Sequence, residues 1–169
     1  MGWAVIALLH KDLGDVAAAE HYFHVAANTT FPPFYTWHEA SAQDGSSAQG
    51  APNFVTGAGG FLQAVINGYG GVRWEHPGML TLRDPQPLPG SEALTLRGVH
   101  FLGARLDIVA RDRGWTVALS SQQAESVPVA LELVMEGGTE PATRLTETPV
   151  ARKRGATGYV RRARTQSSA

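Results

Sequence analysis

The sequence predicts an α+β protein whose first part is helical and whose remainder is an antiparallel β-sandwich. Two observations carry this prediction. Apolar residues recur at helical spacing up to about residue 71, and from residue 72 onward they alternate with polar residues as they do in strands. This change of period indicates two domains, 1–71 and 72–150. Residues 151–169 hold six basic residues and no acidic one, and we expect them to form a disordered basic tail.

Two helices are expected at the start of the chain. Residues 3–13 form an apolar helix that ends at Gly14, and Asp15 caps a second helix over residues 16–28. One face of the second helix should be buried, with Val16, Ala19, Phe23 and Ala26 on it. The first helix is apolar on most of its sides, with Trp3, Val5, Leu8 and Leu9 around it. It should therefore be buried on more than one side, against partner helices outside this chain.

A proline break and a third helix complete the first domain. Pro32 and Pro33 exclude helix, and four aromatic residues fall between residues 31 and 37. The stretch SAQDGSSAQGAP, residues 41–52, is typical of a flexible polar loop. The next helix lies in NFVTGAGGFLQAVINGYGGVR, residues 53–73, with Thr56 as its N-cap and Gly68 as its stop.

The glycine cluster of this third helix, Gly57, Gly59 and Gly60, raises the question of a nucleotide or phosphate site. A dinucleotide fingerprint fails because its third glycine position is Leu62, and a P-loop fails because the stretch has no lysine. Two readings remain. Glycine allows close contact between helices, which we favour. Alternatively, the first turn leaves backbone N–H groups open to an anion or a hydroxyl oxygen.

The second domain should contain six short strands. Leu80 and Leu82, Leu94 and Leu96, and Leu106 and Ile108 would each share a face. Turns are expected at Gly103 and at residues 112–114, and PQPLPG separates the first two strands. We expect Trp115 to lie in the core. The strands fall at residues 79–84, 92–98, 99–103, 104–112, 114–120 and 127–135.

Composition excludes several classes of function. The chain has 169 residues, 43% of them hydrophobic, and no apolar run long enough to span a membrane. The N-terminus lacks the features of a signal peptide, so the compartment is undetermined and the cytoplasm is favoured. The absence of cysteine excludes disulfides and thiolate chemistry. His21 and His24 lie three residues apart without a convincing metal-binding spacing that includes a carboxylate, and such a pair is more often solvated surface, so neither a metal nor a cofactor is expected. Nucleic-acid binding through the basic tail is the less favoured reading of that segment.

Three strings resemble the carboxyl-terminal part of glycoside hydrolase family 65: PFYTWHEA at 33–40, the glycine-rich segment at 53–73, and LTLRDPQPLPG at 80–90. The likeness runs from about residue 3 to residue 120. It implies the last helices of an (α/α)6 barrel followed by a β-sandwich. It also implies part of an inverting, α-glucosidase-like hydrolase that removes glucose from a glucosyl disaccharide or glycopeptide, such as the glucosyl-galactosyl-hydroxylysine of collagen. The remainder of the barrel would be its partner.

The resemblance also assigns roles to residues. In the family's phosphorylases, the segment matching residues 53–60 binds phosphate with a His-Ala-Ala-Ser string, whereas this chain has Phe-Val-Thr-Gly there. The departure favours a hydrolase. Both catalytic carboxylates are implied to lie upstream of residue 1, and Glu39 is a weaker candidate, because a carboxyl beside aromatic rings can act as a general acid. The residues implied to contact the sugar are Trp37, His38, Glu39, Asn53, Thr56, Gly57, Gly59 and Gly60.

Two alternatives stay open. Glu39 can instead be a loop-capping carboxylate on a structural turn. The chain as a whole can instead be a non-catalytic carbohydrate-binding or scaffold protein, which uses its sandwich and its loop without chemistry.

Overall fold

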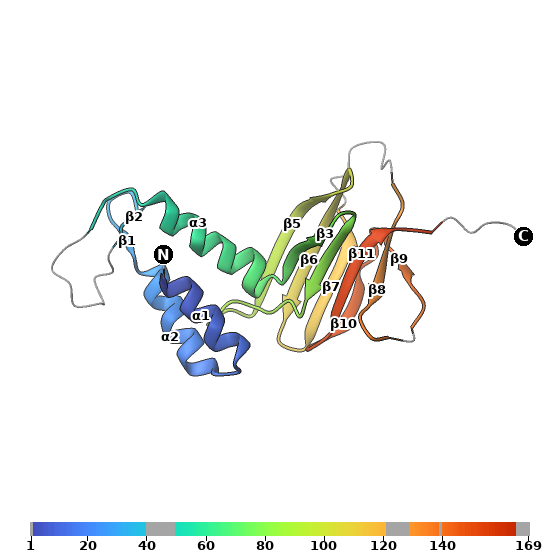
Figure 1. The fold of residues 1–169 in the computed structure, drawn as a ribbon, viewed down its shortest axis with the longest axis horizontal. Coiled ribbons are helices and arrows are strands. Elements are labelled where there is room, and N and C mark those ends of the chain that lie inside the picture. The colour runs from blue at the N-terminus through green and yellow to red at the C-terminus, as the bar shows by residue number, and fades with distance from the viewer. Residues whose placement is uncertain (1, 40–49, 121–128, 139, 165–169) are drawn as a thin grey trace, which may run out of the picture. The chain divides into compact units, whose positions relative to one another are not determined.

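The computed structural model describes residues 2–39, 50–120, 129–138 and 140–164. The chain forms two compact units, residues 1–68 and 69–169, called here the helical unit and the sheet unit (Figure 1). Most of the loop expected at 41–52, and the first residues of the strand expected at 127–135, lie outside the described residues. None of the described helices is long and apolar enough to cross a bilayer.

The helical unit begins with α1 (Gly2–Asp12) and α2 (Val16–Ala27), which pack against each other (Figure 1). Asp15 caps α2 as expected: its Oδ1 accepts a hydrogen bond of 3.1 Å from the N–H of Ala18. Ala19, Phe23 and Ala26 are buried. Val16 is 74% exposed, so its expected burial is wrong. It is the first residue of α2 and lies directly after the turn between the two helices, where α1 has already ended.

The third helix consists of α3 (Val55–Gln63) and a π-helical continuation, η1 (Ala64–Tyr69). The N-cap is Phe54, so the expectation of Thr56 is wrong and the helix begins two residues earlier than expected. Asn53, directly before this cap, has a left-handed φ of 58°. Gly68 is not a stop either. It lies inside η1, and a Cβ there would collide with the Leu8 side chain.

Residues 29–38, expected only to interrupt the helices, form a small hairpin of β1 (Thr30–Phe31) and β2 (Thr36–Trp37). Thr30 pairs with Trp37, and Phe31 pairs with Thr36. The two prolines and the two exposed aromatic residues Phe34 and Tyr35 occupy its tip.

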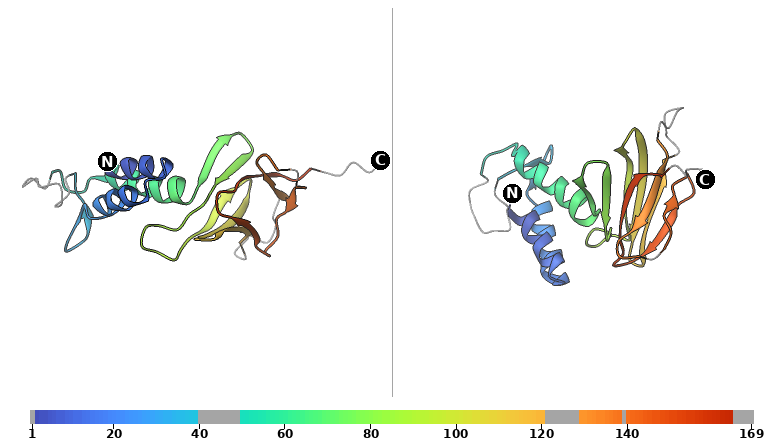
Figure 2. Two further views of the ribbon diagram at one scale, coloured as in Figure 1. Left: turned by 90° about the horizontal axis from the view of Figure 1, so that it is seen from below. Right: turned by 45° about the vertical axis from the view of Figure 1, so that its right-hand side comes forward.

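The sheet unit consists of two antiparallel sheets (Figure 2). One has the order β10-β7-β6-β5 and the other the order β3-β4-β11-β8-β9. The α+β class and the antiparallel arrangement are confirmed. The strands are β3 (Val72–His76), β4 (Met79–Arg83), β5 (Ala93–Phe101), β6 (Ala104–Arg111), β7 (Gly114–Leu119), β8 (Leu131–Met135), β9 (Thr143–Arg144), β10 (Val150–Lys153) and β11 (Thr157–Arg162).

The expected strands 92–98 and 99–103 form one strand, β5. This strand pairs with β6 over residues 93–96 and again over residues 99–101, with a register shift between Leu96 and Val99. Gly98 lies in this irregularity, which interrupts the pairing without ending the strand. The turns at Gly103 and at residues 112–114 are present where they were expected. Leu96 is only half-buried, unlike Leu94.

Each sheet contributes one apolar face to the core. Trp115 is 1% exposed, which confirms its expected place. The two sheets are linked by Arg152 of β10, whose Nε lies 3.0 Å from the sulfur of Met135 in β8 and whose Nη2 donates to Thr143 Oγ1 in β9 at 3.2 Å. The largest fully buried side chains are those of Val72, Leu80, Leu82, Pro85, Leu106, Ile108, Trp115, Val117, Leu131, Leu133 and Val160.

The expected disordered tail at 151–169 is wrong for residues 151–162, which supply most of β10 and all of β11. β11 pairs with β4 on one side and with β8 on the other. Composition alone missed this strand because it contains few apolar residues. Its backbone is bonded on both sides, and Gly158 and Val160 face the core, so pairing stabilises a sequence that would not form a strand by itself.

Candidate functional site

The residues expected at the sugar site all lie in the helical unit, and backbone hydrogen bonds bring most of them together. The N–H of His38 donates to the carbonyl of Thr29 at 2.8 Å, which fixes the end of the hairpin. The N–H of Phe54 donates to the carbonyl of Trp37 at 2.7 Å. This second bond ties the hairpin directly to the start of α3, so the two motifs named from the sequence form one local structure.

Trp37 is a packing residue in this arrangement. It is half-buried, and its ring centroid lies 5.0 Å from that of Phe61 in α3. Gly57 is buried against it: an added Cβ would lie 2.7 Å from the Phe54 ring and 3.3 Å from Trp37 Cδ1. Gly57 therefore serves close packing, but against the hairpin and the N-cap residue of its own helix, not against another helix as expected.

His38 points into a small cavity between the hairpin and the helices. Its Nδ1 is buried without a hydrogen-bond partner among the described residues, and its Nε2 lies 3.4 Å from Thr36 Oγ1. The imidazole also packs 4.5 Å from the ring of Phe31. The cavity has a volume of about 10 Å³, room for about one water molecule and far too small for a sugar ring. Its lining includes Trp3, Ala26, Thr29, Trp37, His38 and Phe61.

Glu39 lies on the surface and bonds to the far end of the loop. Its Oε2 accepts a hydrogen bond of 3.4 Å from the N–H of Ala51, and its own N–H donates to the carbonyl of Ala51 at 3.2 Å. This reciprocal pair joins residues on either side of the segment 40–49. The geometry is that of a loop-capping carboxylate, although the exposed carboxylate oxygens keep capacity for a hydroxyl group.

The remaining candidates line the open side of the same structure. Asn53 and Thr56 are exposed, as is Gly59. An added Cβ at Gly59 would meet nothing within 4 Å, so this glycine does not serve packing within the described residues. Gly60 is half-buried. The cluster is thus divided, with Gly57 turned to the interior and Gly59 turned to a surface that another group can approach.

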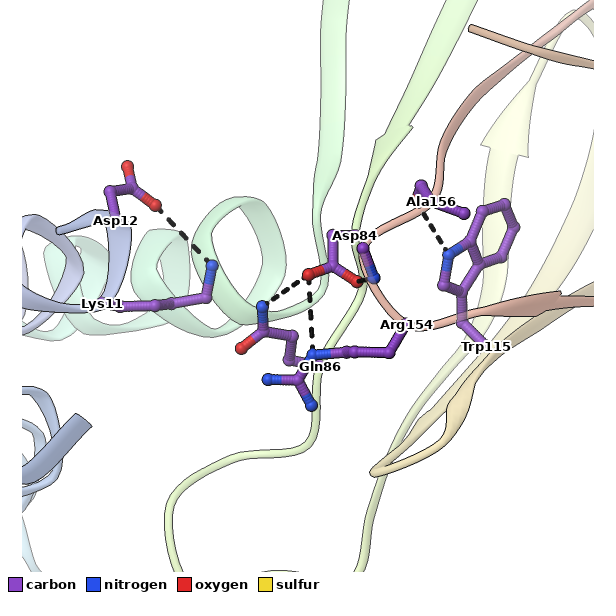
Figure 3. A network of polar contacts seen from close by, with 8 residues as sticks. Lys11, Asp12, Asp84, Gln86, Trp115, Arg154 and Ala156 are labelled. Atoms are coloured by element: carbon purple, nitrogen blue, oxygen red, sulfur yellow. Dashed lines mark hydrogen bonds and ion pairs between the residues drawn. The ribbon is translucent and has the colours of Figure 1, made fainter. Parts of the chain in front are cut away.

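Sequence reasoning missed the exposure of Phe34 and Tyr35, which are 85% and 71% exposed at the hairpin tip. The available signal was the crowding of aromatic residues between two prolines and Trp37. It also missed a polar network in the sheet unit, centred on Asp84 (Figure 3). The Asp84 carboxylate accepts from Gln86 Nε2 at 2.8 Å and lies 3.6 Å from Arg154 Nε.

No protein-family model matches the chain, but individual known proteins do, and they point to one family. The chain is 32% identical over 139 residues to the protein-glucosylgalactosylhydroxylysine glucosidase of Danio rerio, covering 82% of this chain and 20% of that protein. It is 36% identical over 98 residues to the protein of the same name from Dictyostelium discoideum, covering 58% and 12%. The chain thus spans about a fifth or less of the length of these relatives.

Among solved structures, a protein named "Putative kojibiose phosphorylase from human microbiome" matches with a TM-score of 0.54 and 10% identity. The match covers 90% of this chain and 19% of that one. At this identity it shows a shared fold. Together with the sequence relatives it confirms the resemblance to glycoside hydrolase family 65, consistent with its carboxyl-terminal part.

Proposed function

From the relationship of this chain to glycoside hydrolase family 65, we propose that it is the carboxyl-terminal portion of an inverting, α-glucosidase-like hydrolase. The substrate is a glucosyl disaccharide or glycopeptide such as the glucosyl-galactosyl-hydroxylysine of collagen. The observation that carries the proposal is the 32% identity, over 82% of this chain, to a glucosidase named for that substrate. The reaction is hydrolysis, because the phosphate-binding His-Ala-Ala-Ser string is replaced by Phe-Val-Thr-Gly.

The chain contributes a wall of the sugar site. The hairpin end and the start of α3 present Glu39, Asn53 and Thr56 on the surface, with the open backbone around Gly59 between them. These groups donate to and accept from sugar hydroxyls. Trp37, His38, Gly57 and Gly60 hold this wall in shape from within. The cavity beside His38 is too small to take the sugar, so the site itself lies on the exposed side.

The rest of the (α/α)6 barrel supplies the catalytic carboxylates and covers α1. Val5, Leu9 and Leu13 follow one another at a spacing of four residues and are 52%, 58% and 81% exposed. Such a stripe is typical of a helix that packs on a further helix. Further helices of the barrel would bury it.

The experiment is to isolate the native polypeptide with an antibody against residues 78–150 and to incubate it with glucosyl-galactosyl-hydroxylysine. We expect a polypeptide several times larger than 18.0 kDa. It should release glucose with inverted anomeric configuration, and NMR of the released sugar identifies the anomer. A native polypeptide of 18.0 kDa that releases no glucose would contradict the proposal and favour the non-catalytic carbohydrate-binding reading.

A further inference from the structure

Among the described residues of the sheet unit, a groove lies on the face of each sheet. The groove on the four-stranded sheet has a volume of about 570 Å³ and is lined by charged and hydroxyl side chains, among them Arg97, Asp107 and Thr116. None of the residues found to line it is aromatic. The groove on the five-stranded sheet has a volume of about 270 Å³ and contains Tyr159. The second groove thus differs from the first in having a tyrosine ring in its lining.

The alternation of β4 and β11 builds the second groove. Leu80 and Leu82 of β4 turn inward and are fully buried. The residues between and after them face the other side of the sheet, where Thr81 pairs with Tyr159 and Arg83 pairs with Thr157. Because side chains alternate along a strand, these four residues form one patch on the face away from the core.

The Tyr159 ring has neighbours on both adjoining strands of this patch. Thr81 flanks it on β4, and Val134 flanks it on β8. The guanidinium of Arg161 lies 5.9 Å from its ring centroid. Arg161 is itself fixed, since its Nε donates to Glu132 Oε1 at 2.8 Å. The half-buried ring thus has neighbours on both adjoining strands and a guanidinium over it, which lowers the cost of ordering the ring when a ligand binds.

Hydrogen-bond donors and acceptors surround the Tyr159 ring. Glu75 and Glu136 offer carboxylate acceptors, and Arg83 offers guanidinium donors. Glu75 is oriented by Thr81, whose hydroxyl donates to its Oε2 at 3.3 Å. Glu136 is fixed through its backbone, because its N–H donates to the carbonyl of Thr157 at 2.9 Å.

We propose that this groove, the Tyr159 groove, binds one hexopyranose ring of a neutral saccharide. A sugar ring presents a C–H face that packs on an aromatic ring, and hydroxyls that both donate and accept. The groove has that combination: the phenol ring of Tyr159, the imidazole of His76, two carboxylates and one guanidinium. The opposite charges around it disfavour a strongly charged ligand. Its volume lies just below the range of drug-sized sites, which suits a single ring.

This inference does not depend on the proposed hydrolase activity. All residues of the Tyr159 groove belong to the sheet unit, whereas the wall of the proposed sugar site belongs to the helical unit. Substitution of Trp37 or Glu39 should accordingly leave binding in the Tyr159 groove unchanged. The failure of one proposal can thus be told from the failure of the other.

The test is saturation-transfer NMR on the 169-residue chain with methyl α-glucopyranoside as the probe. We expect saturation transfer to the ring protons of the sugar. Tyr159→Ala and Glu136→Gln should each weaken binding at least tenfold, and Tyr159→Phe should retain it because the ring remains. Thr116→Ala, in the groove of the other sheet, is the matched control and should bind like the unmodified chain.

Two results would overturn the inference. One is the absence of saturation transfer from a chain that circular dichroism shows to be folded. The other is equal binding by Tyr159→Ala, Glu136→Gln and the unmodified chain. If Tyr159→Ala does not fold, Glu136→Gln decides, because its side chain is exposed.

Discussion

The carboxylate of Asp84 accepts a hydrogen bond of 2.7 Å from the backbone N–H of Gly155, a residue 71 positions later in the chain. The bond joins the end of β4 to the turn between β10 and β11. Nearby, the indole Nε1 of Trp115 donates to the carbonyl of Ala156 at 3.1 Å. The side chains of Trp115 in β7 and of Asp84 at the end of β4 thus both bond to the turn between β10 and β11.

This relationship predicts that Asp84→Ala destabilises the sheet unit. The substitution removes the acceptor of Gly155 and leaves Arg154 without its ion pair. We expect the free energy of unfolding to fall by about 1–3 kcal/mol, measured by urea denaturation. Asp84→Asn keeps one acceptor oxygen and tolerates the φ of 40°, so its free energy of unfolding should fall less than that of Asp84→Ala. Glu92→Ala, at an exposed position, is the control.

Gly114 is a second point where the sheet unit admits no side chain. Its φ is 149°, and an added Cβ would collide with the carbonyl oxygen of Arg152 in β10. We expect Gly114→Ala to lower the free energy of unfolding by about 3 kcal/mol or more, since backbone atoms must move. Gly78→Ala meets nothing within 4 Å and has a φ of 77°. It should cost only about 1–2 kcal/mol of conformational strain, so similar losses for both variants would contradict the steric explanation.

The final strands should be essential for folding. A chain ending at residue 150 loses β11, the strand between β4 and β8, and we expect its sheet unit to lack cooperative thermal unfolding. A chain ending at residue 164 keeps every described strand and is the control. A native-like melting transition in the shorter chain, followed by circular dichroism, would show that 151–162 is dispensable.

Gly57 and Gly59 should respond to alanine in opposite directions. Gly57→Ala brings a methyl group against the Phe54 ring and should destabilise the helical unit. Gly59→Ala enters open space within a helix and should raise the free energy of unfolding by about 0.5–1 kcal/mol. If the backbone at Gly59 contacts sugar, this stabilised variant should nevertheless bind substrate more weakly. Urea denaturation and substrate titration of the native protein measure the two effects separately.

The variant Glu39→Gln, made in the native hydrolase, distinguishes a structural role of Glu39 from a role in sugar binding or proton transfer. Glutamine keeps an acceptor for the N–H of Ala51, so the loop should stay closed. If Glu39 contacts the sugar, KM should rise several-fold while kcat changes little. A fall in kcat of a hundredfold or more, with KM unchanged, would instead assign Glu39 to proton transfer. Glu20→Gln, on the exposed surface of α2, should change neither constant.

The local features of this protein could be predicted from its sequence. The cap at Asp15, the turn at Gly103 and the burial of Trp115 follow from residue type and spacing, and each is present in the structure. The same holds for the change from helical to strand periodicity, and for the strings that indicated the family. The cap and the turn depend on residues close together in the chain. The burial of Trp115 depends on distant strands, but the alternation of apolar and polar residues along its own strand already indicates the face on which it lies.

Only the tertiary structure decided the rest. The strand at 157–162 exists because two distant strands bond to both of its edges. Trp37 is a packing residue because Phe61 and Gly57 reach it from another element. Gly57 and Gly59 are the same residue type two positions apart, but an added Cβ at Gly57 would meet Phe54 and Trp37 whereas one at Gly59 would meet nothing within 4 Å. The free energy that settles each of these cases comes from contacts between segments far apart in the chain, and residue spacing carries no record of such contacts.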